Sequence, residues 1–120
     1  MSEKKTYTGG CHCGRVRFDV RADFTHVTLC NCSICSRMGW LLAFVPGEDF
    51  TLRSGEDALT DYQFGKKHIH HTFCSTCGVN PFSRGSVPGT GKEAYVVNAR
   101  CVDGLDLEQL TVKHFDGKSL

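Results

Sequence analysis

The stretch "GGCHCG" (Gly9–Gly14) and its distant counterpart "FCSTCG" (Phe73–Gly78) each place two cysteines directly before a glycine. A glycine after the last cysteine lets the backbone turn so that its amides can point at the thiolate sulfurs. Four thiolates complete the tetrahedral coordination of Zn²⁺, an arrangement typical of closed, structural sites. The pattern therefore predicts a structural zinc ion bound by four residues: Cys11, Cys13, Cys74 and Cys77.

This zinc ion would join the start of the chain to its second half and close a loop of about sixty residues. Disulfides and an iron–sulfur cluster are the alternatives for the same cysteines. Zinc is favoured because no export signal is visible and cytosolic thiols are kept reduced. In addition, Cys-x-Cys pairs rarely close on each other, since the short spacing strains an S–S bond.

A third motif, "LCNCSICSRMG" (Leu29–Gly39), holds three cysteines rather than four, namely Cys30, Cys32 and Cys35. A zinc ion with three protein ligands keeps a fourth position for water or substrate, which is the signature of a catalytic site. The alternative is a second closed site whose fourth ligand lies elsewhere in the chain. The candidates for that ligand are Cys101, His12, His68, His70 and His71. The spacing alone leaves both alternatives open.

The composition fits a soluble globular protein and excludes several other classes. With 120 residues, of which 40% are hydrophobic, the chain is expected to form one domain over residues 1–120. No stretch approaches the roughly 20 apolar residues of a membrane span, and the N-terminal residues lack the apolar segment of a secretory signal. The net charge of +1 and the absence of a basic stripe argue against a nucleic-acid partner. We therefore expect a cytoplasmic protein.

Alternating hydrophobicity predicts a mostly β fold. In 15–22, for example, Val16, Phe18 and Val20 share one face and charged residues occupy the other. The thirteen glycines suit turns between short strands, whereas helical patterns are limited to single turns after Cys35 and at 106–110. We expect an all-β fold of small antiparallel sheets clipped together by the structural zinc. The predicted strands are 15–22, 26–30, 40–46, 49–55, 59–65, 68–74 and 93–102.

Other side chains are candidates for chemistry at the three-cysteine motif. Arg37 follows Cys35 by two residues, so its guanidinium could bind a substrate carboxylate or hydrogen-bond the thiolates. Trp40 and Phe82 could wall a pocket. A proton donor or acceptor for the reaction would come from three titratable candidates: His71, Asp103 and His114.

Taken together, "GGCHCGRVRF", "CNCSICSRMG", "FCSTCGVNPFSRG" and "VVNARCVDG" resemble the family of glutathione-dependent formaldehyde-activating enzymes, which includes the centromere-protein-V-like domains. The resemblance runs from about Thr8 to Asp116, with the motifs in the family's order. It implies a β-tent fold of small sheets joined at a zinc ion. It also implies two zinc ions, the first bound by the four cysteines named above. The second, more labile ion would be bound by Cys30, Cys32 and Cys35, with one coordination position open.

The resemblance further implies a carbon–sulfur lyase reaction that joins formaldehyde to glutathione and gives S-hydroxymethylglutathione. The expected partners are then a small thiol such as glutathione and an aldehyde, with Cys30, Cys32, Cys35 and Arg37 as the catalytic residues. Two other classes of function are compatible with the motifs. One is a non-catalytic binding module, and the other is a thiol-redox or metal-handling protein that uses the three clustered thiols.

Overall fold

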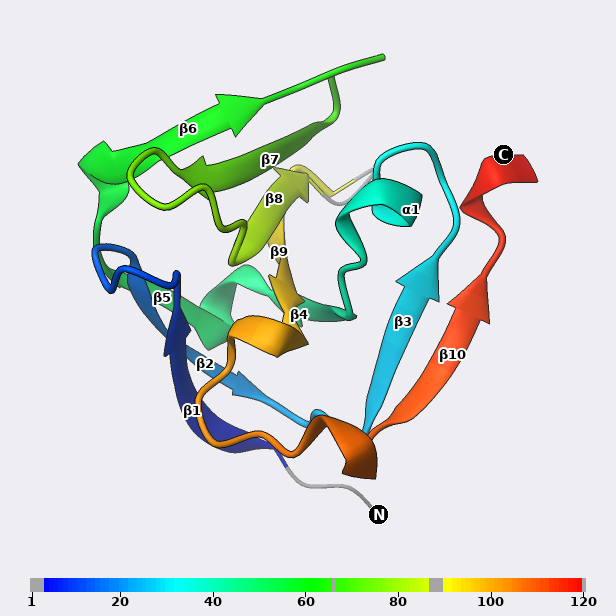
Figure 1. Ribbon diagram of the computed structural model, residues 1–120, viewed down its shortest axis with the longest axis horizontal. Helices are drawn as coiled ribbons and strands as arrows, with labels where there is room; N and C mark the ends of the chain where they lie inside the picture. The colour runs from blue at the N-terminus through cyan, green and yellow to red at the C-terminus, as the bar shows by residue number, and fades with distance from the viewer. Residues whose placement is uncertain (1–3, 66, 87–89, 120) are drawn as a thin grey trace.

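A computed structural model describes residues 4–65, 67–86 and 90–119 of the chain (Figure 1). Nearly all of its regular structure is extended, as predicted. The strands are β1 (Lys5–Gly10), β2 (Arg17–Ala22), β3 (His26–Cys30), β4 (Leu42–Pro46), β5 (Phe50–Ser54), β6 (Leu59–Tyr62), β7 (Ile69–Cys74), β8 (Phe82–Ser86), β9 (Glu93–Asn98) and β10 (Thr111–Phe115).

Helical structure in the described residues is limited to short turns. The α-helix α1 (Cys35–Met38) has a single turn and follows the three-cysteine motif, where a turn was expected. The turn expected at 106–110 is also present, because the Asp106 side chain accepts a hydrogen bond from the Glu108 amide. The 3₁₀ turns are η1 (Gly47–Asp49), η2 (Glu56–Ala58), η3 (Ala99–Cys101), η4 (Leu107–Gln109) and η5 (Gly117–Ser119).

The described strands form two sheets. A three-stranded sheet has the order β1-β2-β5, and a seven-stranded sheet has the order β10-β3-β4-β9-β8-β7-β6. All neighbouring strands pair antiparallel except β10 and β3, which run parallel and lie side by side in Figure 1. This parallel pair departs from the purely antiparallel sheets that the sequence predicted, because β10 reaches β3 after a long excursion through the rest of the fold.

An aromatic cluster packs the two sheets against each other. Phe18 and Phe50 come from the three-stranded sheet and stack with their ring centroids 5.2 Å apart. Phe50 also stacks on Tyr95 of β9, at 4.1 Å, and both phenylalanines contact Phe82 of β8. Val16 and Phe18 are fully buried and Val20 almost so, which confirms the face predicted from the alternation.

Several sequence expectations need correction in detail. Residues 99–102 do not continue the predicted late strand, because β9 ends at Asn98 and Cys101 lies in the turn η3. The segment 40–46 is not buried throughout, since Phe44 of β4 is 69% exposed. Phe82 lies in the core and lines none of the described cavities, so it does not wall the pocket.

No helix in the described parts of the chain is both long and apolar enough to cross a membrane.

Phe18→Ala is expected to lower the free energy of unfolding by about 3–5 kcal/mol, because it empties a fully buried site between the sheets. Urea unfolding followed by circular dichroism measures this loss. Phe44→Ala is the matched control: its side chain is largely exposed, and the expected change is within about 0.5 kcal/mol. Equal losses for the two variants would contradict the packing described here.

Candidate metal centres and adjoining cavity

The loop between β1 and β2 and the end of β7 bring four thiols together. Their sulfur atoms all lie within 4.8 Å of one another, and the Sγ atom of Cys13 is 3.6 Å from those of Cys11 and Cys74. Tetrahedral Zn²⁺ with Zn–S bonds of about 2.3 Å places its sulfurs about 3.8 Å apart, so the spacing suits one such ion. We call this set, which matches the predicted one, the four-cysteine cluster: Cys11, Cys13, Cys74 and Cys77.

Backbone amides support the sulfurs of this cluster. Gly14 and Gly78 have φ angles of 85° and 80°, which favour glycine. The turn at Gly78 lets the amide of Val79 hydrogen-bond the Cys77 sulfur. This hydrogen bond has the largest effect of several that lower the pKa of Cys77 to about 6. This arrangement agrees with the sequence prediction, in which a glycine after the last cysteine lets backbone amides point at the thiolate sulfurs.

Gly14 has the corresponding position after Cys13 in the first motif. The Arg15 amide, which follows Gly14, lowers the pKa of Cys13. Cys13 is exposed, but desolvation by the surrounding atoms and the three neighbouring thiols act in the opposite direction and together raise its pKa to about 11. Crowded thiols resist losing all their protons at once, and a bound cation would relieve that repulsion. The donor set therefore suits a dication.

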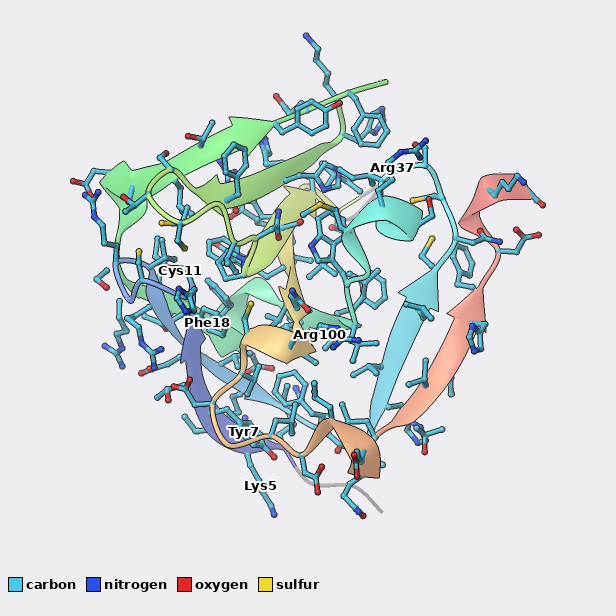
Figure 2. The ribbon with its side chains drawn as sticks, in the orientation of Figure 1. Lys5, Tyr7, Cys11, Phe18, Arg37 and Arg100 are labelled. Carbon is cyan, nitrogen blue, oxygen red and sulfur yellow. The ribbon has the colours of Figure 1, made fainter. Side chains whose placement is uncertain are left out.

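The three remaining motif cysteines also converge. The sulfur atoms of Cys30, Cys32 and Cys35 lie within 4.8 Å of one another, and we call them the three-cysteine cluster. Cys30 ends β3, and Cys35 begins α1. The Cys32 amide donates to the Cys30 sulfur over 3.4 Å. The separation of Cys11 from Arg37, which follows Cys35, shows that the two clusters lie in different parts of the molecule (Figure 2).

Burial and hydrogen bonds divide the thiols of the three-cysteine cluster. Burial raises the pKa of Cys35, and its thiol neighbours add to the effect. Burial also opposes ionisation of Cys32, but hydrogen bonds from the Cys35 amide and the neighbouring groups outweigh it and lower the pKa of Cys32. The cluster thus contains one thiol that ionises readily beside one that resists, as expected where three sulfurs compete for protons.

In the described part of the chain, no fourth histidine, cysteine or acidic side chain joins the three sulfurs within 4.8 Å. Cys101, one candidate for that role, is turned toward the other cluster: burial raises its pKa to about 11, and the charges of Cys11 and Cys77 contribute. His70 is paired with Asp61, with 2.5 Å between Nδ1 and Oδ2. Of the proposed fourth ligands, His71 is the one that shares a cavity with the cluster.

The C-terminal segment, which sequence reasoning did not connect with the site, supports the three-cysteine cluster. The Asn31 side chain donates to Asp116 over 2.8 Å and accepts from the Lys118 amide over 2.9 Å. Gly117 packs so closely that a Cβ atom there would lie 2.6 Å from the Cys30 sulfur. The polar Asn31 between two cysteines was the only local signal, and it did not reveal its partner.

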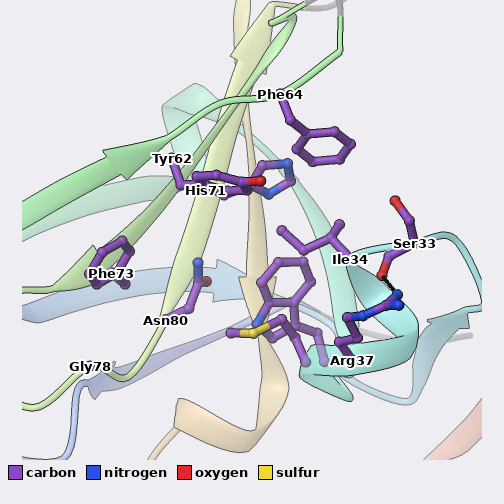
Figure 3. A pocket seen from close by; sticks show the side chains of 11 residues that line it. Ser33, Ile34, Arg37, Tyr62, Phe64, His71, Phe73, Gly78 and Asn80 are labelled. Atoms are coloured by element: carbon purple, nitrogen blue, oxygen red, sulfur yellow. Dashed lines mark hydrogen bonds between the residues drawn. The ribbon is translucent and has the colours of Figure 1, made fainter.

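Two adjoining cavities open beside the three-cysteine cluster. The larger, of about 630 Å³, is lined by Arg37 of α1 (Figure 3). The smaller, of about 390 Å³, reaches all three cysteines of the cluster. Together they connect the cluster to Arg37, and they share four lining residues: Ile34, Trp40, Phe64 and His71.

Aromatic rings hold His71 in the wall of both cavities. Its imidazole stacks on Trp40 at 5.6 Å and on Phe64 at 5.4 Å, between ring centroids. Its Nδ1 atom lies 3.4 Å from the Ser83 hydroxyl. Burial lowers the pKa of His71, so the ring is neutral near pH 7. Ile69, His71 and Phe73 alternate along β7, and each of the three lines at least one of these cavities.

The other residues predicted to take part in chemistry at the three-cysteine motif lie in different parts of the structure. Arg37 donates to the Ser33 carbonyl oxygen over 2.7 Å (Figure 3). Asp103 binds Arg17 and Thr8 beside β1, and these hydrogen bonds hold its pKa below the usual range. It therefore lies outside both cavities. His114 of β10 borders a third hollow, of about 330 Å³, which also reaches Cys30 and Cys35.

The sequence matches the family "glutathione-dependent formaldehyde-activating enzyme" over residues 6–115. This chain therefore belongs to the family of glutathione-dependent formaldehyde-activating enzymes, whose activity is glutathione-dependent formaldehyde activation. Its fold is also similar to the crystal structure of a Rhodobacter sphaeroides protein determined as a structural-genomics target. The TM-score is 0.78 with 32% sequence identity, over 90% of this chain and 99% of that one.

The buried environment of His71 gives a pH-dependent prediction. In an NMR titration, the His71 imidazole is expected to take up its proton below the ordinary pKa of 6.5. At a pH between the lowered pKa of folded His71 and the ordinary pKa of 6.5 in the unfolded chain, the unfolded chain binds more protons than the folded protein. The free energy of unfolding therefore rises with pH in this range. The contribution of neutral, buried His71 to the free energy of unfolding is complete above pH 6.5, and it is lost as the pH falls through the pKa of the folded protein.

His71→Phe assigns the resonance and serves as the control for stability, because it keeps a ring in the wall and removes the titrating group. Its free energy of unfolding should depend less on pH between 5 and 7 than that of the wild type. A His71 midpoint at or above 6.5 would show that the ring is not buried as described.

Proposed function

We propose that this protein is a zinc-dependent carbon–sulfur lyase that catalyses the reversible addition of a thiol to an aldehyde at the three-cysteine cluster. The single observation that carries the proposal is that three convergent thiols face a cavity with no fourth protein ligand among the described residues. Family membership supports the same reaction, with glutathione and formaldehyde as the family's substrates. In this proposal each chain binds two zinc ions, and the protein is located in the cytoplasm.

In this proposal the two clusters have different tasks. The four-cysteine cluster would hold a structural zinc ion and join the two sheets, whereas the three-cysteine cluster would hold a zinc ion beside the cavity where the substrate binds. A bound zinc ion supplies two kinds of chemistry there: it ionises a thiol, and it polarises a carbonyl as a Lewis acid. A labile second ion is expected, because three protein ligands hold a metal less completely than four.

The reaction forms one bond between the thiol sulfur and the aldehyde carbon. The electron pair of the carbonyl π bond moves to oxygen, and the proton lost by the thiol ends on that oxygen. We assign the transfer of this proton to His71, because it is neutral near pH 7 and lines both cavities. The reverse step returns the proton to sulfur and releases the aldehyde.

Arg37 is proposed to bind the substrate rather than the thiolates. Its guanidinium lines the larger cavity and donates to the Ser33 carbonyl, which fixes its position. The remaining N–H groups can bind a carboxylate in a bidentate manner. The aromatic walls around His71 keep water from the reacting atoms, which strengthens each electrostatic contact.

Two cysteine substitutions distinguish the tasks of the two clusters. Cys77→Ser is expected to unfold the protein, because metal binding at the four-cysteine cluster contributes directly to folding. Cys32→Ser should stay folded and lose one of two zinc ions. Circular dichroism and elemental analysis of the purified proteins measure both results. A well-folded Cys77→Ser protein with a full zinc content would contradict this division.

The activity itself is tested by NMR with formaldehyde and glutathione. The wild type is expected to form the hemithioacetal faster than the spontaneous reaction, and Cys32→Ser at the spontaneous rate. Ser36→Ala is a matched control, since it lies in α1 beside the cluster and offers no thiol. Wild-type rates equal to the spontaneous rate for glutathione and for the other thiol–aldehyde pairs used below would remove the lyase assignment.

A further inference from the structure

Outside the three-cysteine cluster itself, the walls of the two adjoining cavities carry little charge. Among the described residues that line them, Arg37 is the one side chain with a permanent charge, and no aspartate, glutamate or lysine takes part. Most of the remaining surface is aromatic or aliphatic. The larger rings are those of Trp40, Tyr62, Phe64, Phe73, Phe44 and Phe115.

Arg37 has no acidic partner among the residues that the structure describes. In the described ranges, no carboxylate forms an ion pair with it, and its guanidinium donates a hydrogen bond to the backbone carbonyl of Ser33. Figure 3 shows Arg37 and Ile34 on the α1 side of the cavity, opposite Phe64 and His71. An unpaired guanidinium at the margin of an apolar cavity is suited to one carboxylate on an otherwise apolar molecule.

Glutathione fits this wall poorly. The tripeptide carries two carboxylates and one ammonium, together with polar amides. One guanidinium can pair with one of these carboxylates, and none of the described residues that line the cavities is an acidic side chain that could receive the ammonium. Burying an unpaired ammonium or carboxylate against aromatic rings costs free energy that the apolar contacts do not return. A molecule with a single anionic group and an apolar body incurs no such cost.

We propose that the substrate bound here has an aromatic or branched aliphatic body and a single carboxylate. The body lies in the two adjoining cavities against the wall that Trp40, His71 and Phe64 form, and the carboxylate pairs with Arg37. This proposal rests on the proposed function for the reaction at the cluster and changes the class of molecule on which that reaction acts. The apolar body belongs either to the thiol or to the aldehyde, and the sulfur–carbon bond forms between them as described above.

Binding is measured without any reaction, because Trp40 is the only tryptophan of the chain and lines both cavities. The probes are 3-phenylpropanoate, which has neither thiol nor aldehyde, and S-methylglutathione. We expect 3-phenylpropanoate to change the Trp40 fluorescence in a saturable manner, with a Kd at least tenfold lower than that of S-methylglutathione. Tighter binding of S-methylglutathione, or no saturable response to 3-phenylpropanoate, overturns the proposal.

Variants test the two parts of the contact. Arg37→Ala should weaken binding of 3-phenylpropanoate about tenfold and leave binding of the neutral 3-phenylpropan-1-ol unchanged. Phe64→Ala should weaken both. The matched control is Arg53→Ala, since Arg53 pairs with Asp19 on the three-stranded sheet, away from the cavities. Equal effects of Arg37→Ala on the anion and on the alcohol would contradict the carboxylate contact.

A substrate screen separates this proposal from the proposed function. The NMR assay compares three pairs: formaldehyde with glutathione, formaldehyde with 2-sulfanyl-3-phenylpropanoate, and 3-(4-formylphenyl)propanoate with 2-sulfanylethanol. Acceleration that is greatest for one of the last two pairs supports the proposal and shows which reactant carries the apolar body. Acceleration greatest for glutathione overturns it and leaves the lyase reaction standing. Binding of 3-phenylpropanoate through Arg37 without acceleration of any pair would remove the lyase reaction alone.

Discussion

The meeting of four thiols between two sheets is the constraint on which the rest of the structure depends. Cys11 and Cys13 follow the first strand of the three-stranded sheet, whereas Cys74 and Cys77 lie at the end of β7 in the seven-stranded one. A core of this size, divided among short strands and many turns, gains little from hydrophobic burial alone. A metal ion bound by the four thiols would join the sheets at one point, close to the aromatic cluster of Phe18, Phe50 and Phe82 that packs them together.

The three-cysteine cluster depends on that arrangement indirectly. Its sulfurs come from the end of β3 and the start of α1, but the cavity beside it is completed by β7, which also carries Cys74. His71 lies three residues before Cys74 on the same strand, so the position of β7 at the four-cysteine cluster also sets where the imidazole faces the cavity. Stability and the proposed chemistry are therefore linked through a single strand.

The sequence was most informative where local patterns decide the structure. The alternation around Phe18, the glycines after Cys13 and Cys77, and the stop at Pro46 each depend on neighbouring residues, and each is found as predicted. It was least informative where distant segments meet. The strands β1, β8 and β10 were not predicted, because two contain glycines and β10 is exposed along its length. The contact of Gly117 with Cys30 and the position of Phe82 in the core depend on tertiary packing that no short motif encodes.

The parallel pairing of β10 with β3 has a consequence for the order of folding. The two strands are adjacent in the sheet although β3 ends at Cys30 and β10 begins at Thr111, so about two thirds of the chain lies between them. Closing so long a loop costs more chain entropy than forming any hairpin here, and we expect it to come late. During synthesis on the ribosome, Cys30, Cys32 and Cys35 therefore emerge long before the segment that packs on them. Until then these thiols are open to any soft metal or oxidant that the nascent chain meets.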